Sequence, residues 1–395
     1  MGREGKNPQT TLSAVWNNPA IRALVVQALV LIGVVLLGIY LVDNTLANMK
    51  ARGIASGFEF LGRTAGFSIA THLIDYEEAN TYGRAFLVGL LNTLLVSVVG
   101  IVFATVLGFT IGVARLSNNW LISRLATLYI EIIRNVPLLL QLFFWYFAVL
   151  RNLPGPKASI DFYGVVFLNK RGLFTPNPVF GPEIVWSGIS LLVAIGFIVC
   201  LAYWSRRRRD RRGHSLPVTT ISIVILTGVP VMSLWFTDFP IIWELPVLKG
   251  FNFRGGTTII PELVALTLAL SLYTASFIAE VVRAGILSVN RGQSEAAYAL
   301  GLHRTLTLRL VVIPQALRVI IPPLTNQYLN LTKNSSLAAA IAYPDLVLVF
   351  AGTTLMQTGQ AVEIIAITMS VYLTLSLAIA AGMNLYNRHI ALVER

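Results

Sequence analysis

The sequence predicts an all-α polytopic membrane protein with about eight transmembrane helices. Of its 395 residues, 55% are hydrophobic and only 12% are charged. Soluble domains carry about 25% charged residues, so the composition excludes an ordinary soluble protein. Apolar runs of about 20 residues, the length that crosses a bilayer as a helix, recur along the chain between short polar segments.

Eight apolar runs are assigned as spans: residues 21–42, 84–114, 136–150, 183–204, 216–236, 261–287, 317–350 and 363–386. The second run is longer than a bilayer requires, which predicts a tilted helix. Pro137 suits the first turn of the third helix, where an N–H has no intrahelical partner. Prolines and polar residues interrupt the seventh run, so we predict one span followed by an irregular re-entrant segment there.

Basic residues set the predicted orientation. Residues 206–212, between the fourth and fifth runs, contain six arginines. A basic loop of this kind stays in the cytoplasm; the alternative is a patch for anionic lipid or nucleic acid, which no second feature supports. With this loop inside, eight spans place both termini in the cytoplasm. The net charge of +12 is therefore assigned to topology, and no nucleic-acid partner is predicted.

Common catalytic and cofactor motifs are missing from the sequence. It contains no Gly-x-x-x-x-Gly-Lys-Ser/Thr phosphate loop and no His-Glu-x-x-His zinc motif. The four histidines lie outside the apolar runs, so an intramembrane hydrolase would lack its base. Cys200 is the single cysteine and provides neither a disulfide nor a metal cluster. The sequence therefore favours a non-catalytic protein that binds no cofactor or metal itself.

Ionisable and polar residues within or near spans are costly in lipid and often mark function. Glu131 and Arg134 are three residues apart, as are Glu280 and Arg283, so each pair shares a helix face and favours a local ion pair. The third place is the polar cluster of residues 330–336. It is either a helix break whose backbone groups are met by side chains or part of a solute pathway, and both interpretations stay open.

A polar island separates the sixth and seventh runs. Residues 292–301 read Gly-Gln-Ser-Glu-Ala-Ala-Tyr-Ala-Leu-Gly, and the topology places them in the cytoplasm. The central residues are good helix formers. We predict a short helix with Ser294 as its N-cap and with Gly301 ending it in left-handed geometry. An ordinary connecting helix is the simplest interpretation of the island alone.

The small side chains of the island favour a second interpretation, in which another protein surface approaches the helix closely. Glu295, Ala296, Ala297 and Gly301, followed by Ile313-Pro314, resemble the cytoplasmic coupling loop of ABC importer permeases. Flanking segments extend the resemblance to the permeases of polar amino-acid importers, the histidine/glutamine/arginine family. These segments are residues 80–94, 131–141, 279–286 and 314–326.

The resemblance implies the fold and function of a type I ABC importer transmembrane domain in the bacterial inner membrane. It implies a permease subunit that provides half of an amino-acid pathway. The implied partners are a homologous permease, two ATP-binding subunits that carry ATP and Mg²⁺, a periplasmic amino-acid-binding protein and the membrane lipids. Glu295, Ala296, Ala297 and Gly301 would couple the permease to the ATPases, and Gln141, Asn334 and Ser335 would line the substrate pathway.

The chain departs from typical family members in two respects. It is longer between its two blocks of similarity, which resembles the enlarged general L-amino-acid permease subgroup. Many relatives have an acidic residue at the position of Asn334, so the amide suggests a site not committed to cationic substrates.

The predicted spans and the resemblance together divide the chain into five parts. Residues 1–20 form a cytoplasmic segment, and 21–80 form the first span and a periplasmic loop. Residues 81–150 are the first part of the core, and 151–260 are an insertion with two extra spans and the arginine-rich loop. Residues 261–395 are the second part of the core. The alternative function is an ion-coupled secondary transporter, but membrane-embedded acidic residues and internal repeats, which would indicate one, are scarce here.

Overall fold

The computed structural model describes residues 19–51, 53, 56–212, 217–237 and 241–390. Most of the predicted cytoplasmic segment, residues 1–20, therefore lies outside the described residues. The α-helices are α2 (Pro19–Ala51), α3 (Tyr82–Arg115), α4 (Trp120–Asn135), α5 (Leu138–Phe143), α6 (Ile184–Arg212), α7 (Val218–Phe236), α8 (Pro261–Leu287), α9 (Arg291–Ala299), α10 (Arg304–Thr307), α11 (Ile313–Asn334), α12 (Leu355–Thr358) and α13 (Ala361–Ile390). Short 3₁₀ or π segments lie at Glu59–Gly62, Phe144–Val149, Leu150–Asn152, Pro156–Ala158, Leu308–Val312, Ser335–Ile341 and Val347–Thr354.

Within the described residues, six helices are long and apolar enough to cross a membrane. They are Pro19–Thr45, Tyr82–Arg115, Ile184–Ser205, Pro261–Leu287, Arg304–Ile341 and Ala361–Arg388. A shorter apolar helix, Thr220–Phe236, corresponds to the predicted fifth span. The predicted third span differs, because α4 and the helical segment 138–152 form a pair bent by 105° at Val136-Pro137. Counting the bent pair once, the prediction of about eight spans agrees with the fold.

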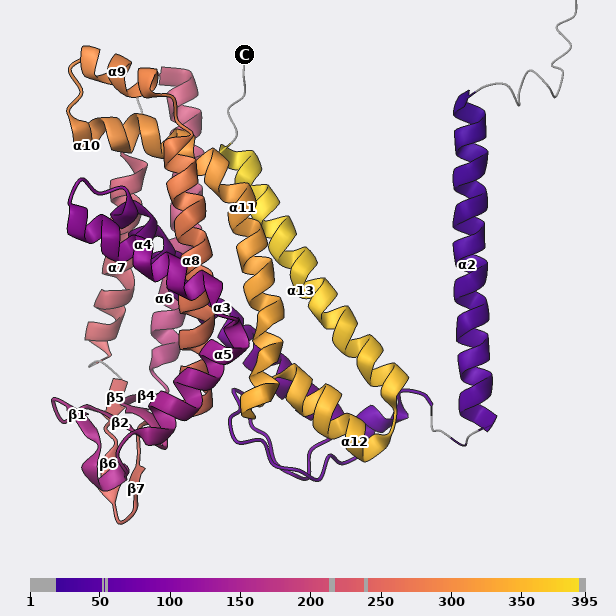
Figure 1. The fold of residues 1–395 in the computed structure, drawn as a ribbon. Helices are drawn as coiled ribbons and strands as arrows, with labels where there is room; N and C mark the ends of the chain where they lie inside the picture. The colour runs from indigo at the N-terminus through magenta and orange to yellow at the C-terminus, as the bar shows by residue number, and fades with distance from the viewer. Residues whose placement is uncertain (1–18, 52, 54–55, 213–216, 238–240, 391–395) are drawn as a thin grey trace, which may run out of the picture.

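Helices α3 and α8 pack along each other and form the centre of the molecule (Figure 1). Their approach depends on glycine: a Cβ at Gly108 would lie 2.6 Å from the Cβ of Ile278, and one at Gly112 would lie 2.7 Å from the carbonyl oxygen of Ala279. Small residues at helix interfaces let backbones approach closely inside a membrane, where van der Waals packing drives association. This contact holds α8 in place.

The seventh apolar run continues as helix α11 through Pro322 and Pro323 and changes to 3₁₀ geometry at Ser335. The chain then reverses at Ala342, whose φ of 61° is left-handed. The π segment Val347–Thr354 and α12 follow. Helix α13 then runs back alongside α11 as the next candidate span (Figure 1). The predicted span with an irregular re-entrant segment is thus present, and the turn at Ala342 lies between the Pro322-Pro323 pair and Pro344.

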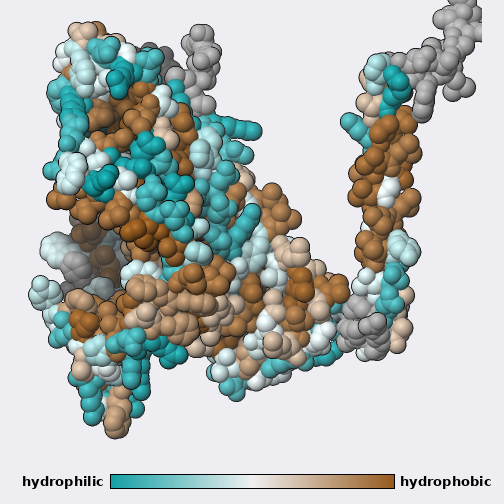
Figure 2. Space-filling model, in the orientation of Figure 1, coloured by the Kyte–Doolittle hydropathy of each residue, from teal (hydrophilic) through white to brown (hydrophobic). Residues whose placement is uncertain are grey.

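Helix α2 stands apart from the other helices in Figure 1, and its apolar window has no residue buried within the chain. Apolar side chains cover most of the face of α2 that is visible in Figure 2. Such a helix finds its surroundings in lipid or in another subunit.

A small β structure, which the sequence did not predict, lies at the end of the molecule opposite α9 and α10 (Figure 1). Its strands are β1 (Ile160–Phe162), β2 (Val166–Asn169), β3 (Gly172–Thr175), β4 (Asn177–Phe180), β5 (Ile241–Glu244), β6 (Val247–Lys249), β7 (Asn252–Arg254) and β8 (Thr257–Ile259). They form an antiparallel sheet of order β1-β2-β3-β8 and the two-stranded pairs β4-β5 and β6-β7. We call residues 151–182 and 241–260 the β lobe.

Candidate coupling site

The polar island forms helix α9, which directly follows α8. Its N-cap is Asn290, whose Oδ1 accepts a hydrogen bond from the backbone N of Gly292 at 2.8 Å. The predicted N-cap, Ser294, is wrong, because the helix begins at Arg291 and Ser294 lies within it. Asn and Ser are equally good N-caps, and the asparagine comes first in the chain.

The end of α9 is a Schellman motif. Gly301 has a φ of +78°, its N–H bonds to the carbonyl of Tyr298 at 2.9 Å, and the N–H of Leu302 bonds to the carbonyl of Ala297 at 3.1 Å. This is the pairing that closes a helix through a left-handed residue. The prediction that Gly301 ends the helix in left-handed geometry is confirmed. A side chain at Gly301 would meet open space, so the site remains accessible to a partner.

The two faces of α9 have different environments. Glu295 and Ala296 are exposed, whereas Ala297 is 3% exposed and is packed within the chain. Gln315 donates from Nε2 to Oε1 of Gln293 at 3.2 Å and links α11 to α9. Leu300, which the sequence analysis did not single out, is 82% exposed. An apolar side chain on a polar helix end, next to a left-handed glycine, was the signal that could have found it.

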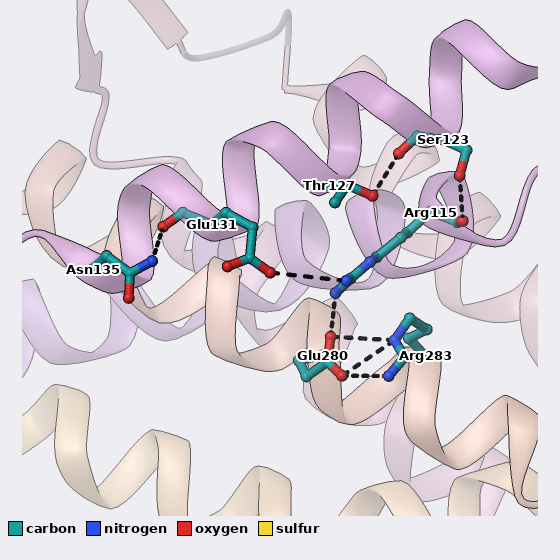
Figure 3. Close-up of polar contacts among 7 residues, drawn as sticks. All are labelled: Arg115, Ser123, Thr127, Glu131, Asn135, Glu280 and Arg283. Atoms are coloured by element: carbon teal, nitrogen blue, oxygen red, sulfur yellow. Dashed lines mark hydrogen bonds and ion pairs between the residues drawn. The ribbon is translucent and has the colours of Figure 1, made fainter.

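A cluster of charged side chains fixes the end of α8 that leads into α9 (Figure 3). Arg115 of α3 makes an ion pair with Glu280 of α8. Nη2 of Arg115 also lies 4.0 Å from Oε1 of Glu131 on α4. Arg283 donates from Nη2 to Oε1 of Glu280 at 2.5 Å. The predicted pairing of Glu280 with Arg283 is confirmed, and the cluster joins three helices at this end of the core.

The predicted ion pair between Glu131 and Arg134 is wrong. Glu131 faces Arg115 on α3 instead, and the guanidinium of Arg134 lies 5.1 Å from the centre of the Phe277 ring on α8. Both residues have tertiary partners, which the spacing along one helix does not reveal. A cation over an aromatic face is a favourable contact in its own right.

The three predicted pathway residues are all at least partly buried, and they lie at two breaks in the helices. Gln141 is 6% exposed, and its Nε2 donates to the carbonyls of Ile133 at 2.8 Å and Val136 at 2.9 Å. It thereby satisfies backbone groups freed by the 105° bend. Ser335 is 1% exposed and donates to the carbonyl of Thr332, and Asn334 ends α11. Among the described residues, no hydrogen bond joins Gln141 to the other two.

A buried polar cluster next to this region was missed by the sequence analysis. Asn92 of α3 donates from Nδ2 to the carbonyls of Thr71 and Pro344, both at 2.8 Å. The N–H of Leu346 donates to Oγ1 of Thr93 at 3.0 Å. Asp345, 1% exposed, caps the re-entrant segment by accepting from the N–H of Leu348. The Pro-Asp pair in apolar sequence was the available signal, and the cluster fastens the re-entrant segment to α3.

These features describe a helical membrane protein that presents a rigid, capped helix beyond the end of its central span. The chain belongs to the family of binding-protein-dependent transport system inner membrane components, whose model matches residues 100–395. It is therefore an ABC transporter permease component, a transport subunit rather than an enzyme. The predicted type I ABC importer transmembrane domain agrees with this family.

Individual relatives extend the match to nearly the whole chain. It is 56% identical over 378 residues to the putative amino-acid ABC transporter permease protein YhdX of Escherichia coli K12, covering 96% of each chain. It is 48% identical to the general L-amino acid transport system permease protein AapQ of Rhizobium johnstonii, over 96% of this chain and 94% of the relative. The glutamate/aspartate import permease protein GltJ of Escherichia coli K12 is 32% identical, and 56% of this chain covers 94% of GltJ.

Proposed function

We propose that the chain is the transmembrane permease subunit of an ATP-driven amino-acid importer and provides half of the translocation pathway. The observation that carries the proposal is α9, a short helix closed at both ends and exposed along Glu295 and Ala296. The family to which the chain belongs supports a separate ATPase that acts on this helix, and the sequence itself has no phosphate loop. Amino acids as cargo are supported by the names of the relatives YhdX and AapQ.

The partners follow from this role. Two ATP-binding subunits hold ATP and Mg²⁺ and contact α9, with Glu295, Ala296 and Gly301 at the contact and Ala297 supporting it from within. Closure of the ATPases on ATP shifts the permeases between two states, because the partners bind the two states differently. A homologous permease completes the pore, and a periplasmic amino-acid-binding protein delivers the cargo.

We place the protein in the bacterial inner membrane with both termini in the cytoplasm. The basic run of residues 206–212, which the structure places at the end of α6 and not in a loop, favours this orientation. The five-part division, with residues 81–150 and 261–395 as core and 151–260 as insertion, belongs to the same proposal. It is supported by the packing of α3, from the first part of the core, along α8, from the second part.

The substrate pathway is proposed to pass Asn334, with Gln141 and Ser335 shaping it from the two helix breaks. The support is local: α11 gives way to 3₁₀ geometry directly after Asn334, and irregular backbone inside a membrane occurs where it is packed in protein or lines a cavity. Broken helices of this kind commonly bind substrate in transporters.

Replacing Asn334 with Asp is expected to shift the preference of the transporter toward basic amino acids. A hydrogen bond to a charged partner contributes about 1.5–3 kcal/mol, so the ratio of arginine to glutamine uptake should rise by about tenfold or more. Uptake is measured in proteoliposomes that contain the whole transporter and are energised by ATP. Asn118→Asp, which adds the same charge at an exposed position of the loop between α3 and α4, should leave the ratio unchanged.

Two outcomes would contradict the proposal. An unchanged ratio in Asn334→Asp would mean that this amide serves the backbone and not the substrate. Uptake that runs on an ion gradient without ATP would remove the assignment as an ATP-driven importer.

A further inference from the structure

The β lobe is an ordered structure and not a set of loose loops. Strand β3 pairs with β8, more than 80 residues later in the chain, in the register Leu173↔Ile259 and Thr175↔Thr257. The rings of Phe174 and Phe253 are 2% and 8% exposed and lie 4.9 Å apart between centroids. Asn169, fully buried, donates from Nδ2 to Oγ of Ser159 at 3.0 Å. The lobe therefore presents a preorganised surface, which lowers the entropic cost of binding a partner.

The surface of the lobe is basic. It carries six Lys and Arg side chains against two acidic ones, and all eight residues are exposed. The basic residues are Arg151, Lys157, Lys170, Arg171, Lys249 and Arg254, and the acidic residues are Asp161 and Glu244. In the proposed orientation the lobe is outside the cell, where the positive-inside rule disfavours Lys and Arg. Topology therefore does not account for these charges. It does account for the arginines of residues 206–212, which form the last turns of α6 at its other end.

The lobe also has features of a protein-binding surface. Tyr163, at a turn with a φ of 58°, is 100% exposed, and Phe251 is 78% exposed with Nζ of Lys157 lying 4.9 Å from its ring centre. The lobe also has a groove of about 330 Å³, lined in part by Lys157, Asp161, Phe167 and Leu248. Exposed aromatic residues and arginines, both of which the lobe carries, are enriched at protein interfaces.

The position of the lobe suits a partner that approaches from solution. The β6–β7 hairpin, which carries Lys249 and Arg254, projects away from the ends of α6, α7 and α8 (Figure 1). Figure 2 shows hydrophilic side chains beside apolar ones on the lobe. Strand β8 leads directly into α8, whose first turn is held by a hydrogen bond of 2.6 Å from Tyr146 to Glu262. The same helix leads at its other end into α9.

We propose that the β lobe binds an acidic surface of the periplasmic amino-acid-binding protein and adds a docking contact that permeases without the insertion lack. The inference rests on the proposed function, and it specifies which element of this chain meets that partner. Opposite charges across the contact speed encounter and select the right partner. The attraction acts over roughly a Debye length, about 8 Å at physiological salt.

The test reverses lobe charges in the whole transporter reconstituted in nanodiscs. The probe is the soluble binding protein that stimulates the ATPase activity of the wild-type complex. The variant Lys170→Glu/Lys249→Glu/Arg254→Glu should raise its Kd at least tenfold at low salt, and the wild-type Kd should rise with salt more steeply than that of the variant. Glu244→Lys should lower the Kd. Lys249→Glu alone should also raise the Kd. Its matched control, Arg63→Glu, is an exposed charge reversal outside the lobe and should leave the Kd unchanged.

The outcomes separate the lobe from the proposed function. Equal Kd values and equal salt dependence for wild type and the triple variant would overturn the role of the lobe while the importer assignment stands. Failure of any soluble binding protein to stimulate the ATPase would count against the importer assignment itself. If the variant changes activity only in nanodiscs with anionic lipid, and not the Kd, the lobe binds lipid headgroups and the proposal is wrong.

Discussion

Replacing Gly301 with valine is expected to reduce amino-acid uptake about five- to thirty-fold while the amount of protein in the membrane stays normal. The residue has a φ of +78°, and the left-handed conformation costs an L-residue roughly 1–2 kcal/mol, which is a factor of about 5–30 in a conformational equilibrium. The Schellman end of α9 then opens, and the helix loses its fixed direction. Uptake and ATPase activity of the reconstituted transporter measure the effect.

Gly301→Asn is the matched control, because asparagine tolerates the left-handed conformation better than other non-glycine residues. It should retain most of the uptake. The space around Gly301 is open within the chain, so a loss of uptake in both variants would point to steric contact with the ATPase instead of backbone strain. Normal uptake in Gly301→Val would show that the end of α9 has no part in coupling.

Replacing Gly108 with alanine is expected to destabilise the whole core. The added Cβ would lie 2.6 Å from both Cβ and Cγ2 of Ile278, and the β-branched side chain of Ile278 has little freedom to move away. Overpacking of this kind costs about 1–3 kcal/mol, and here it pushes α3 away from α8. The thermal unfolding midpoint of the purified complex should fall, with less protein recovered from the membrane.

Gly38→Ala provides the comparison, since nothing lies within 4 Å of its added Cβ. Alanine favours a helix over glycine by about 1 kcal/mol, so this variant should unfold at the same temperature or slightly higher. If Gly108→Ala unfolds at the wild-type temperature, the close α3–α8 contact is not what holds the core together.

The sequence was sufficient wherever the cause of a structure lies within a few residues. Gly301 could be predicted because a glycine after a run of helix formers favours a left-handed stop. Glu280 and Arg283 could be paired because one helical turn joins them. The spans could be predicted from the apolar runs for the same reason, because a helix in the membrane forms its backbone hydrogen bonds within itself.

Prediction failed where the partner lies far away in the chain. Glu131 meets Arg115 on another helix, not its neighbour on α4. Strands β3 and β8, of four and three residues, pair across two intervening spans, so neither has a local signal strong enough to identify it. Gln141 was selected as a pathway residue because of the family resemblance, whereas its hydrogen bonds to Ile133 and Val136 depend on a bend that Pro137 alone does not specify.

The central claim is that the exposed face of α9 contacts a separate ATPase, and cysteine cross-linking tests it most directly. The natural Cys200, which is exposed, is first replaced by serine. Glu295→Cys, on the exposed face, should then cross-link to a cysteine placed on a co-expressed ATP-binding subunit. Ala297→Cys, at a position 3% exposed, should not. If Glu295→Cys forms no cross-link while the ATPase co-purifies, or if Ala297→Cys cross-links equally well, the proposed coupling surface is wrong.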